Sequence, residues 1–107
     1  MTVYHQELAA GRWSKFSLAA QLGNVGSEIS RAINWRGRNQ NFQDRALERA
    51  LELLDLTIKT LDSKTRLKEL LRVREVLADA ILGGQEYGST LEDLNKYFFN
   101  FAYLARK

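Results

Sequence analysis

Apolar residues recur along most of this chain at alternating spacings of three and four, which is the repeat of one face of an α-helix. Four stretches with this repeat predict helices over about 13–34, 41–61, 63–82 and 89–106. The predicted fold class is therefore all-α. Because the turns between these stretches are short, we expect an up-down-up-down antiparallel four-helix bundle.

The beginning of the chain lacks this repeat. Residues 1–11 show no sustained period and end at a glycine, which predicts an N-terminal arm over 1–11 and a four-helix bundle over 12–107. Ser14 is a candidate N-cap for the first helix, because a serine hydroxyl can accept a hydrogen bond from a free backbone N–H of the first turn.

Polar and glycine-rich residues separate the predicted helices. The stretch 34–41 interrupts the apolar repeat, and the glycine pair at 83–84 follows the third helix as a C-terminal stop. Ser63 is a candidate N-cap for that helix. The run from Ser89 to Glu92 matches a capping box, which predicts a firm start for the last helix.

Small residues line one face of the first predicted helix. Ala19, Gly23 and Ser27 are spaced four apart, with Gly26 and Ser30 beside them. Each helical glycine costs about 1 kcal/mol relative to alanine, so some interaction should offset that cost. We expect a neighbouring backbone to pack closely on this face. The alternative is a ligand lying against the bare backbone.

The last predicted helix carries more apolar and aromatic residues than one core-facing stripe requires. Such a helix either lies at the centre of the bundle or contacts another subunit. We therefore expect a homo-oligomer, with Tyr97, Phe99 and Tyr103 at the interface between subunits.

Composition limits the chemistry that this chain can perform. Its 107 residues suit one domain, and the lack of cysteine excludes disulfides, thiolate nucleophiles and cysteine-ligated metal sites. His5 is the only histidine, so we expect neither a metal nor another cofactor. No run suits a signal peptide or a membrane span, which predicts a cytoplasmic protein without a membrane partner.

Basic residues would gather at one end of an antiparallel bundle. The net charge is +3 and the isoelectric point is about 9.4. The start of the first helix, the turn between the second and third, and the C-terminus would meet at this end. Its basic residues are Arg12, Lys15, Lys59, Lys64, Arg66, Lys68, Arg106 and Lys107.

A stripe of like charge lies in the third predicted helix. Lys64, Lys68 and Arg72 are spaced four apart, which destabilises an isolated helix by a few tenths of a kcal/mol per pair. Lys64 also lies at a helix N-terminus, where the helix dipole disfavours a cation. These costs favour contact with a polyanion such as RNA or DNA. The alternative is a solvated, solubilising surface.

A second basic group surrounds the first turn. It consists of Arg31, Arg36, Arg38, Arg45 and Arg49 around Trp35, an aromatic residue able to stack on a base. Arg36 and Arg38 are the candidate nucleic-acid contacts. Asp79 and Glu86 should lie at the same end, and simple pairing between these acids and the arginines is the alternative.

Carboxylates on the second and third predicted helices raise an enzymatic alternative. Facing acids could hold Mg²⁺, as in the helical nucleotide pyrophosphohydrolases, although the paired Glu-x-x-Glu and Glu-x-x-Asp motifs of those enzymes are not both present. The candidates would be Glu48, Glu52, Asp55, Glu75 and Asp79. We expect a protein that is not an enzyme.

Two segments are similar to those of a known family. They are Gln21-Leu22 through Ser30-Arg31-Ala32-Ile33-Asn34 and, after a Gly/Arg turn, Ala46-Leu47-Glu48-Arg49-Ala50-Leu51-Glu52-Leu53-Leu54. They resemble the four-helix-bundle proteins encoded in intervening sequences of bacterial large-subunit ribosomal RNA genes, and the related accessory variability proteins of diversity-generating retroelements. The Asn-Ile-Ala-Glu-Gly signature of that family is missing here.

The resemblance implies a bacterial accessory protein that forms a ring, typically a pentamer. It also implies a basic surface that engages nucleic acid and, in the retroelement case, a reverse transcriptase. Together with the basic end, it leads us to expect a non-enzymatic, oligomeric helical adaptor that binds nucleic acid or a nucleic-acid enzyme. The alternatives are a protein-protein scaffold without nucleic acid and the magnesium-dependent hydrolase.

Overall fold

The computed structural model describes residues 11–105 of the chain, and the side chains of 11–103. The described part is all-helical and contains no strand. Its elements are a 3₁₀ turn, η2 (Trp13–Lys15), followed by the helices α1 (Leu18–Trp35), α2 (Gln40–Lys59), α3 (Lys64–Ile81) and α4 (Leu91–Ala105).

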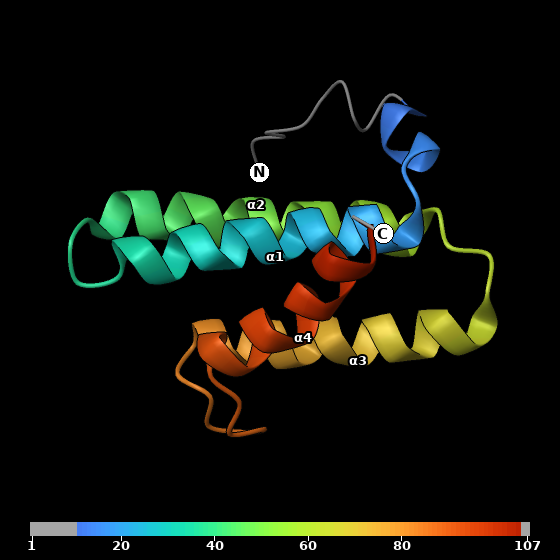
Figure 1. Cartoon of the computed structure of the whole chain (residues 1–107). Helices are drawn as coiled ribbons and strands as arrows, with labels where there is room; N and C mark the ends of the chain where they lie inside the picture. The colour runs from blue at the N-terminus through green and yellow to red at the C-terminus, as the bar shows by residue number, and fades with distance from the viewer. Residues whose placement is uncertain (1–10, 106–107) are drawn as a thin grey trace.

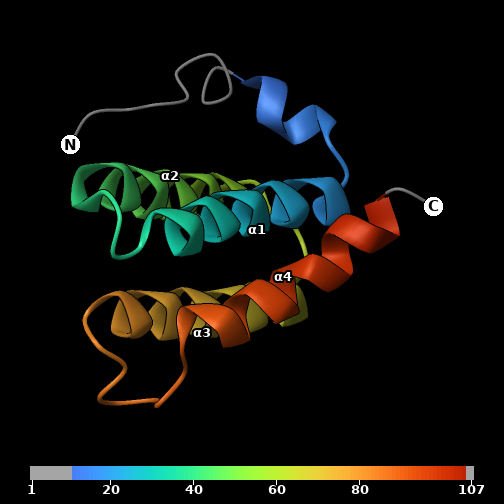
Figure 2. The ribbon, with the colours of Figure 1, turned by 60° about the vertical axis from the view of Figure 1, so that its left-hand side comes forward.

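The helices form two layers around one apolar core. Figure 1 shows α1 and α2 side by side above α3, while α4 begins beside α3 and rises obliquely toward the start of α1. Figure 2 shows the same relation after rotation, with the end of α4 near the start of α1. Every helix contributes to the core, whose fully buried side chains include Leu22, Ile29, Leu54, Leu77 and Phe98.

The first helix begins later than expected. The predicted helix started at 13 with Ser14 as its N-cap, but α1 starts at Leu18, and Ser17 accepts the Ala20 N–H at 3.1 Å. Ser14 instead donates to the Gly11 carbonyl at 2.8 Å. The reason is Phe16, whose backbone is extended and so separates η2 from α1.

The remaining helix ends follow local capping chemistry. Ser63 caps α3 as predicted, by accepting the Arg66 N–H at 3.2 Å. Gly83 and Gly84 follow α3 with φ angles of 114° and 75°, and so confirm the predicted stop.

The capping box of α4 is shifted by one residue from the predicted Ser89–Glu92 pair. The Thr90 hydroxyl accepts the Asp93 N–H at 3.1 Å, and the Asp93 carboxylate accepts the Thr90 N–H at 3.0 Å. Either pair has the spacing of the motif, so the sequence alone does not choose between them. The consequence is that Glu92 is free to interact outside its own helix.

The small residues of α1 allow α4 to approach closely, as predicted. A Cβ atom on Gly26 would lie 2.7 Å from the Cβ of Phe98, and one on Gly23 would lie 3.0 Å from the Cα of Ala102. Beside them, the Ser30 hydroxyl donates to the Asn95 side chain at 2.7 Å. The absence of side chains at 23 and 26 therefore determines how deeply Phe98 is inserted.

We predict that Gly26→Ala destabilises the protein although alanine is the better helix former. The added methyl group collides with Phe98, and overpacking of this kind costs about 1–3 kcal/mol. Urea unfolding followed by circular dichroism measures the change. Ser27→Ala is the matched control on the exposed neighbouring position, and we expect it to stay within about 0.5 kcal/mol of the wild type. Equal stability of Gly26→Ala and wild type would contradict the close approach.

Candidate nucleic-acid-binding surface

A buried tryptophan fixes the start of the described chain to the end of α2. Trp13 is 3% exposed, and its indole N–H donates to the Thr57 hydroxyl at 3.0 Å. Thr57 in turn donates to the Leu53 carbonyl, and the Gln21 amide donates to the Trp13 carbonyl, both at 3.0 Å. Every polar side-chain group of this buried cluster is satisfied, so η2 is held against the last turns of α2.

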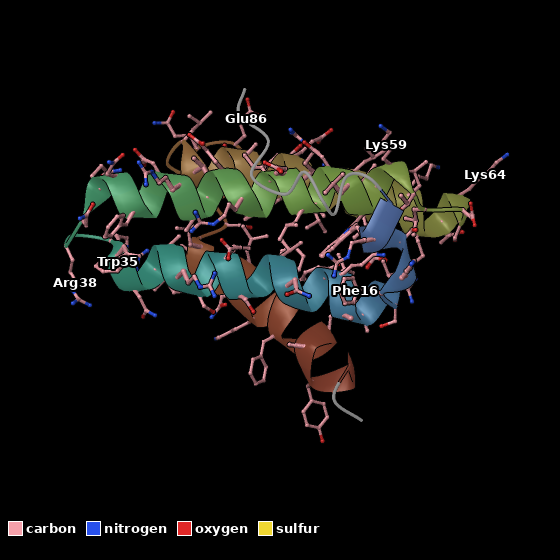
Figure 3. All side chains as sticks on the ribbon, turned by 90° about the horizontal axis from the view of Figure 1, so that it is seen from above. Phe16, Trp35, Arg38, Lys59, Lys64 and Glu86 are labelled. Atoms are coloured by element: carbon pink, nitrogen blue, oxygen red, sulfur yellow. The ribbon has the colours of Figure 1, made fainter. Side chains whose placement is uncertain are left out.

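This anchor brings basic residues of η2 to the same end as those of α2 and α3. Lys15 follows Trp13 by two residues, and Lys59 follows Thr57 by two. Figure 3 shows Lys59 and Lys64 at one end of the molecule, with Trp35 and Arg38 at the opposite end. We call the first of these the lysine end, defined by Lys15, Lys59, Lys64 and Lys68.

The lysine end carries positive charge that no ion pair between described residues neutralises. All four lysines are exposed, and none forms an ion pair with another described side chain. Asp55, four residues before Lys59 on α2, is held by Arg74 through hydrogen bonds of 2.6 and 3.3 Å. Exposed Asp62 is the acid that remains in the connection between Lys59 and Lys64.

The predicted basic residues at this end differ in their surroundings. Arg66 pairs with Glu69 at 3.1 Å, and Arg12 is exposed next to Trp13. Arg106 and Lys107 lie outside the described residues, although the end of α4 lies near the start of α1 (Figures 1 and 2).

Arg72 is separated from the lysines of its stripe by its contacts. Its guanidinium lies 5.2 Å from the ring centre of Tyr87 and donates to the Tyr87 hydroxyl at 3.3 Å. The same hydroxyl donates to Glu75 at 2.8 Å, and this hydrogen bond raises the pKa of Tyr87. Of the predicted stripe, Lys64 and Lys68 therefore remain without an acidic partner in the part of the chain that the structure describes.

The arginines of the opposite end are mostly paired with acids. Arg36 forms a two-point ion pair with Glu92, and these hydrogen bonds lower the pKa of the Glu92 carboxyl. Arg31 and Arg49 both contact the buried Glu28 at 2.5 Å. The pairing expected at this end is present, but its acids are Glu28 and Glu92.

Asp79, one of the acids expected to pair there, has another role. Its carboxylate accepts the backbone N–H groups of Glu86 and Tyr87, at 3.1 and 3.0 Å. It therefore shapes the connection between α3 and α4 instead of neutralising an arginine.

The aromatic residue of this second group is already in contact with neighbours. The Arg38 guanidinium lies 5.3 Å from the ring centre of half-buried Trp35, and the Phe42 ring meets Trp35 edge-on at 4.8 Å. A base stacking on Trp35 would compete with Arg38, so this end is the weaker of the two candidate surfaces.

The carboxylates considered for Mg²⁺ are used in contacts within the protein. Asp55 pairs with Arg74, Glu75 accepts the Tyr87 hydroxyl, and Asp79 accepts backbone N–H groups. Across residues 11–103, no three side chains of the metal-ligating types gather closely enough to hold an ion.

The aromatic residues predicted for an oligomer interface lie on different sides of α4. Phe99 and Tyr103 are 65% and 56% exposed, beside a groove of about 180 Å³ between α1 and α4. Tyr97 is half-buried, and its hydroxyl donates to Glu69 of α3 at 3.0 Å. Burial and this hydrogen bond raise the pKa of Tyr97. The structure thus groups Phe99 with Tyr103 and places Tyr97 between α3 and α4.

The sequence pattern did not point to Phe16, an exposed aromatic residue near the lysine end. It lay inside a predicted helix, whereas its backbone is extended. The sequence signal that could have identified Phe16 is Ser17, the next residue. Ser17 is a second serine suited to capping, and a helix that starts after it leaves Phe16 outside the helix.

Comparisons with protein-family models, curated proteins and solved structures returned no match to this chain. The resemblance to the ribosomal intervening-sequence proteins therefore stays a prediction. Among the described residues, no helix combines the length and the apolar character that crossing a membrane requires.

We predict that Thr57→Val loosens the η2 anchor. Valine has a similar shape but leaves the Trp13 indole N–H buried without an acceptor, which costs about 1–3 kcal/mol of unfolding free energy. Urea unfolding measures the loss. Thr60→Val, at an exposed position of the same helix end, is the control and should change stability by less than about 0.5 kcal/mol. Equal effects of the two substitutions would mean that the hydrogen bond from the Trp13 indole to Thr57 adds nothing specific to the free energy of unfolding.

Proposed function

We propose that this protein is a non-enzymatic, self-associating helical adaptor that binds nucleic acid through its lysine end. The observation that carries the proposal is the difference between the two ends of the molecule. At one end, Arg31, Arg36 and Arg49 are paired with carboxylates of the same chain. At the other end, Lys15, Lys59, Lys64 and Lys68 form no ion pair with any described side chain.

Unpaired surface lysines suit phosphate contacts for a physical reason. A lysine that meets a phosphate releases counterions condensed on the nucleic acid, and the gain in entropy favours binding at low salt. A lysine already held by a carboxylate must first give up that partner. Among residues 11–103, Lys59, Lys64 and Lys68 have no ion pair of this kind to break.

The positions of these charges depend on the direction of each helix. We propose that the four helices run in the up-down-up-down order. It is supported by the side-by-side packing of α1 and α2 and by the short connections at 36–39 and 60–63. This order would bring the start of α1, with Lys15 shortly before it, to the same end as the connection between Lys59 and Lys64.

We predict that Lys64→Glu/Lys68→Glu weakens binding to labelled RNA or DNA in fluorescence anisotropy at low salt. Affinity should fall about tenfold or more, and the slope of log affinity against log salt should decrease by about two.

The matched control is Arg38→Glu/Arg45→Glu, which makes the same change in net charge at the opposite end. We expect a clearly smaller loss. No binding by the wild-type protein, or equal losses in the two variants, would contradict a specific lysine end.

Self-association through α4 is proposed on a separate observation. Phe99 and Tyr103 lie one turn apart and remain exposed beside the groove between α1 and α4. Contact through this face would remove both rings from water, at a gain of roughly 25 cal/mol per Å² of apolar area buried. The same face would also serve the alternative function, a protein-protein scaffold that does not bind nucleic acid.

We predict that the wild-type protein is larger than a monomer in light scattering and that Phe99→Glu shifts it toward a monomer. Leu71→Glu is the control, because Leu71 is also exposed but lies on α3. It should leave the assembly unchanged. A monomeric wild-type protein at high concentration would contradict the proposed self-association.

A further inference from the structure

The proposed nucleic-acid surface includes an aromatic residue whose position is fixed although its ring is exposed. Phe16 is 46% exposed. Its backbone N–H donates to the Trp13 carbonyl at 3.2 Å, and its own carbonyl accepts the Gln21 amide at 3.1 Å. The Phe16 ring meets the Trp13 ring edge-on, with 5.6 Å between ring centres.

The support beneath Phe16 reaches into the core. Trp13 is buried and bound to Thr57 of α2, while Gln21 belongs to the first turn of α1. Phe16 is therefore attached to two helices by its neighbours, while part of its ring still faces solvent. A binding group held in this way loses little conformational entropy when a ligand arrives.

The surroundings of Phe16 are cationic. Lys15 precedes it directly in the chain, and Figure 3 shows Phe16 at the same end of the molecule as Lys59 and Lys64. A single exposed apolar side chain needs no special explanation. An exposed, fixed aromatic ring beside lysines that no described carboxylate pairs with is the combination found in surfaces that bind single strands.

We infer that the lysine end binds single-stranded nucleic acid, with Phe16 stacking on a base while the lysines contact phosphates. This inference rests on the proposed function and narrows its ligand. A flat ring needs access to the face of a base, and in a duplex those faces are covered by neighbouring base pairs. Stacking tolerates any base, so the inference implies little sequence preference.

The opposite end provides an internal comparison. Phe42 is 42% exposed, nearly as much as Phe16, and its ring likewise meets a tryptophan edge-on, Trp35, with 4.8 Å between ring centres. The arginines at this end include Arg36, which is paired with Glu92, and Arg38, whose guanidinium lies over the Trp35 ring. Similar exposure of two phenylalanines therefore occurs in different electrostatic surroundings, and Phe42 is the matched control.

The test compares Phe16→Leu, Phe16→Tyr and Phe42→Leu with the wild-type protein. Leucine keeps an apolar contact with Trp13 but removes the flat ring, whereas tyrosine keeps the ring. The ligands are a labelled, unstructured single strand and a duplex of the same length, each as RNA and as DNA. Anisotropy measures affinity, and thermal unfolding by circular dichroism confirms that each variant is folded.

We expect the wild-type protein to prefer the single strand. Phe16→Leu should weaken single-strand binding by about 5- to 100-fold, which corresponds to the loss of one stacked base, with the salt dependence unchanged. Phe16→Tyr should bind the single strand as tightly as the wild-type protein does. Phe42→Leu should leave the affinity for the single strand unchanged.

The inference is overturned if the duplex binds as tightly as the single strand. It is also overturned if Phe16→Leu leaves single-strand binding unchanged, or weakens single-strand and duplex binding equally. In either case Lys64→Glu/Lys68→Glu would still reduce binding, and the proposed function would stand. If no nucleic acid binds the wild-type protein, the proposed function fails together with the inference.

Discussion

The close approach of α4 to α1 is the constraint on which the rest of the structure depends. Phe98 is fully buried, and it reaches that position because Gly26 offers no Cβ atom to oppose it. A bulkier residue at 26 would move α4 outward, and with it Phe99, Tyr103 and the groove beside them. Two glycines, unfavourable for the helix that contains them, thus determine which aromatic residues are buried and which remain on the surface.

The fold could largely be predicted from sequence because its signals are local and repeated. Four helices, the Ser63 cap, the glycine stop after α3 and the small face of α1 all follow from spacing and residue type. The errors arose where two residues offered the same chemistry. Ser14 and Ser17 both suit an N-cap, and the choice between them depended on Trp13 finding Thr57, forty-four positions along the chain.

The candidate surface was harder to predict from the sequence, because it depends on which charged side chains form ion pairs in the folded protein. Nothing in the sequence pattern pairs Arg36 with Glu92 or Asp55 with Arg74, because these partners are brought together only by tertiary packing. Sequence could therefore count the basic residues at each end but could not show which were neutralised. The same holds for Arg72, which differs from Lys64 and Lys68 because it contacts Tyr87. Tyr87 lies in the connection between α3 and α4, so this contact also depends on tertiary packing.

The different positions of Phe99 and of the lysine end have a consequence for an assembly. Phe99 lies on the side of a helix, whereas Lys59 and Lys64 lie at the end of the molecule. Subunits joined side by side in a cyclic assembly would all present their lysine ends in the same direction. A nucleic-acid strand bound by one subunit would then lie near the lysine ends of the neighbouring subunits. The weak contacts with each subunit would combine, because the bound strand is present at a high effective concentration. A small domain with modest charge would thereby hold a long polyanion more firmly than its own composition suggests.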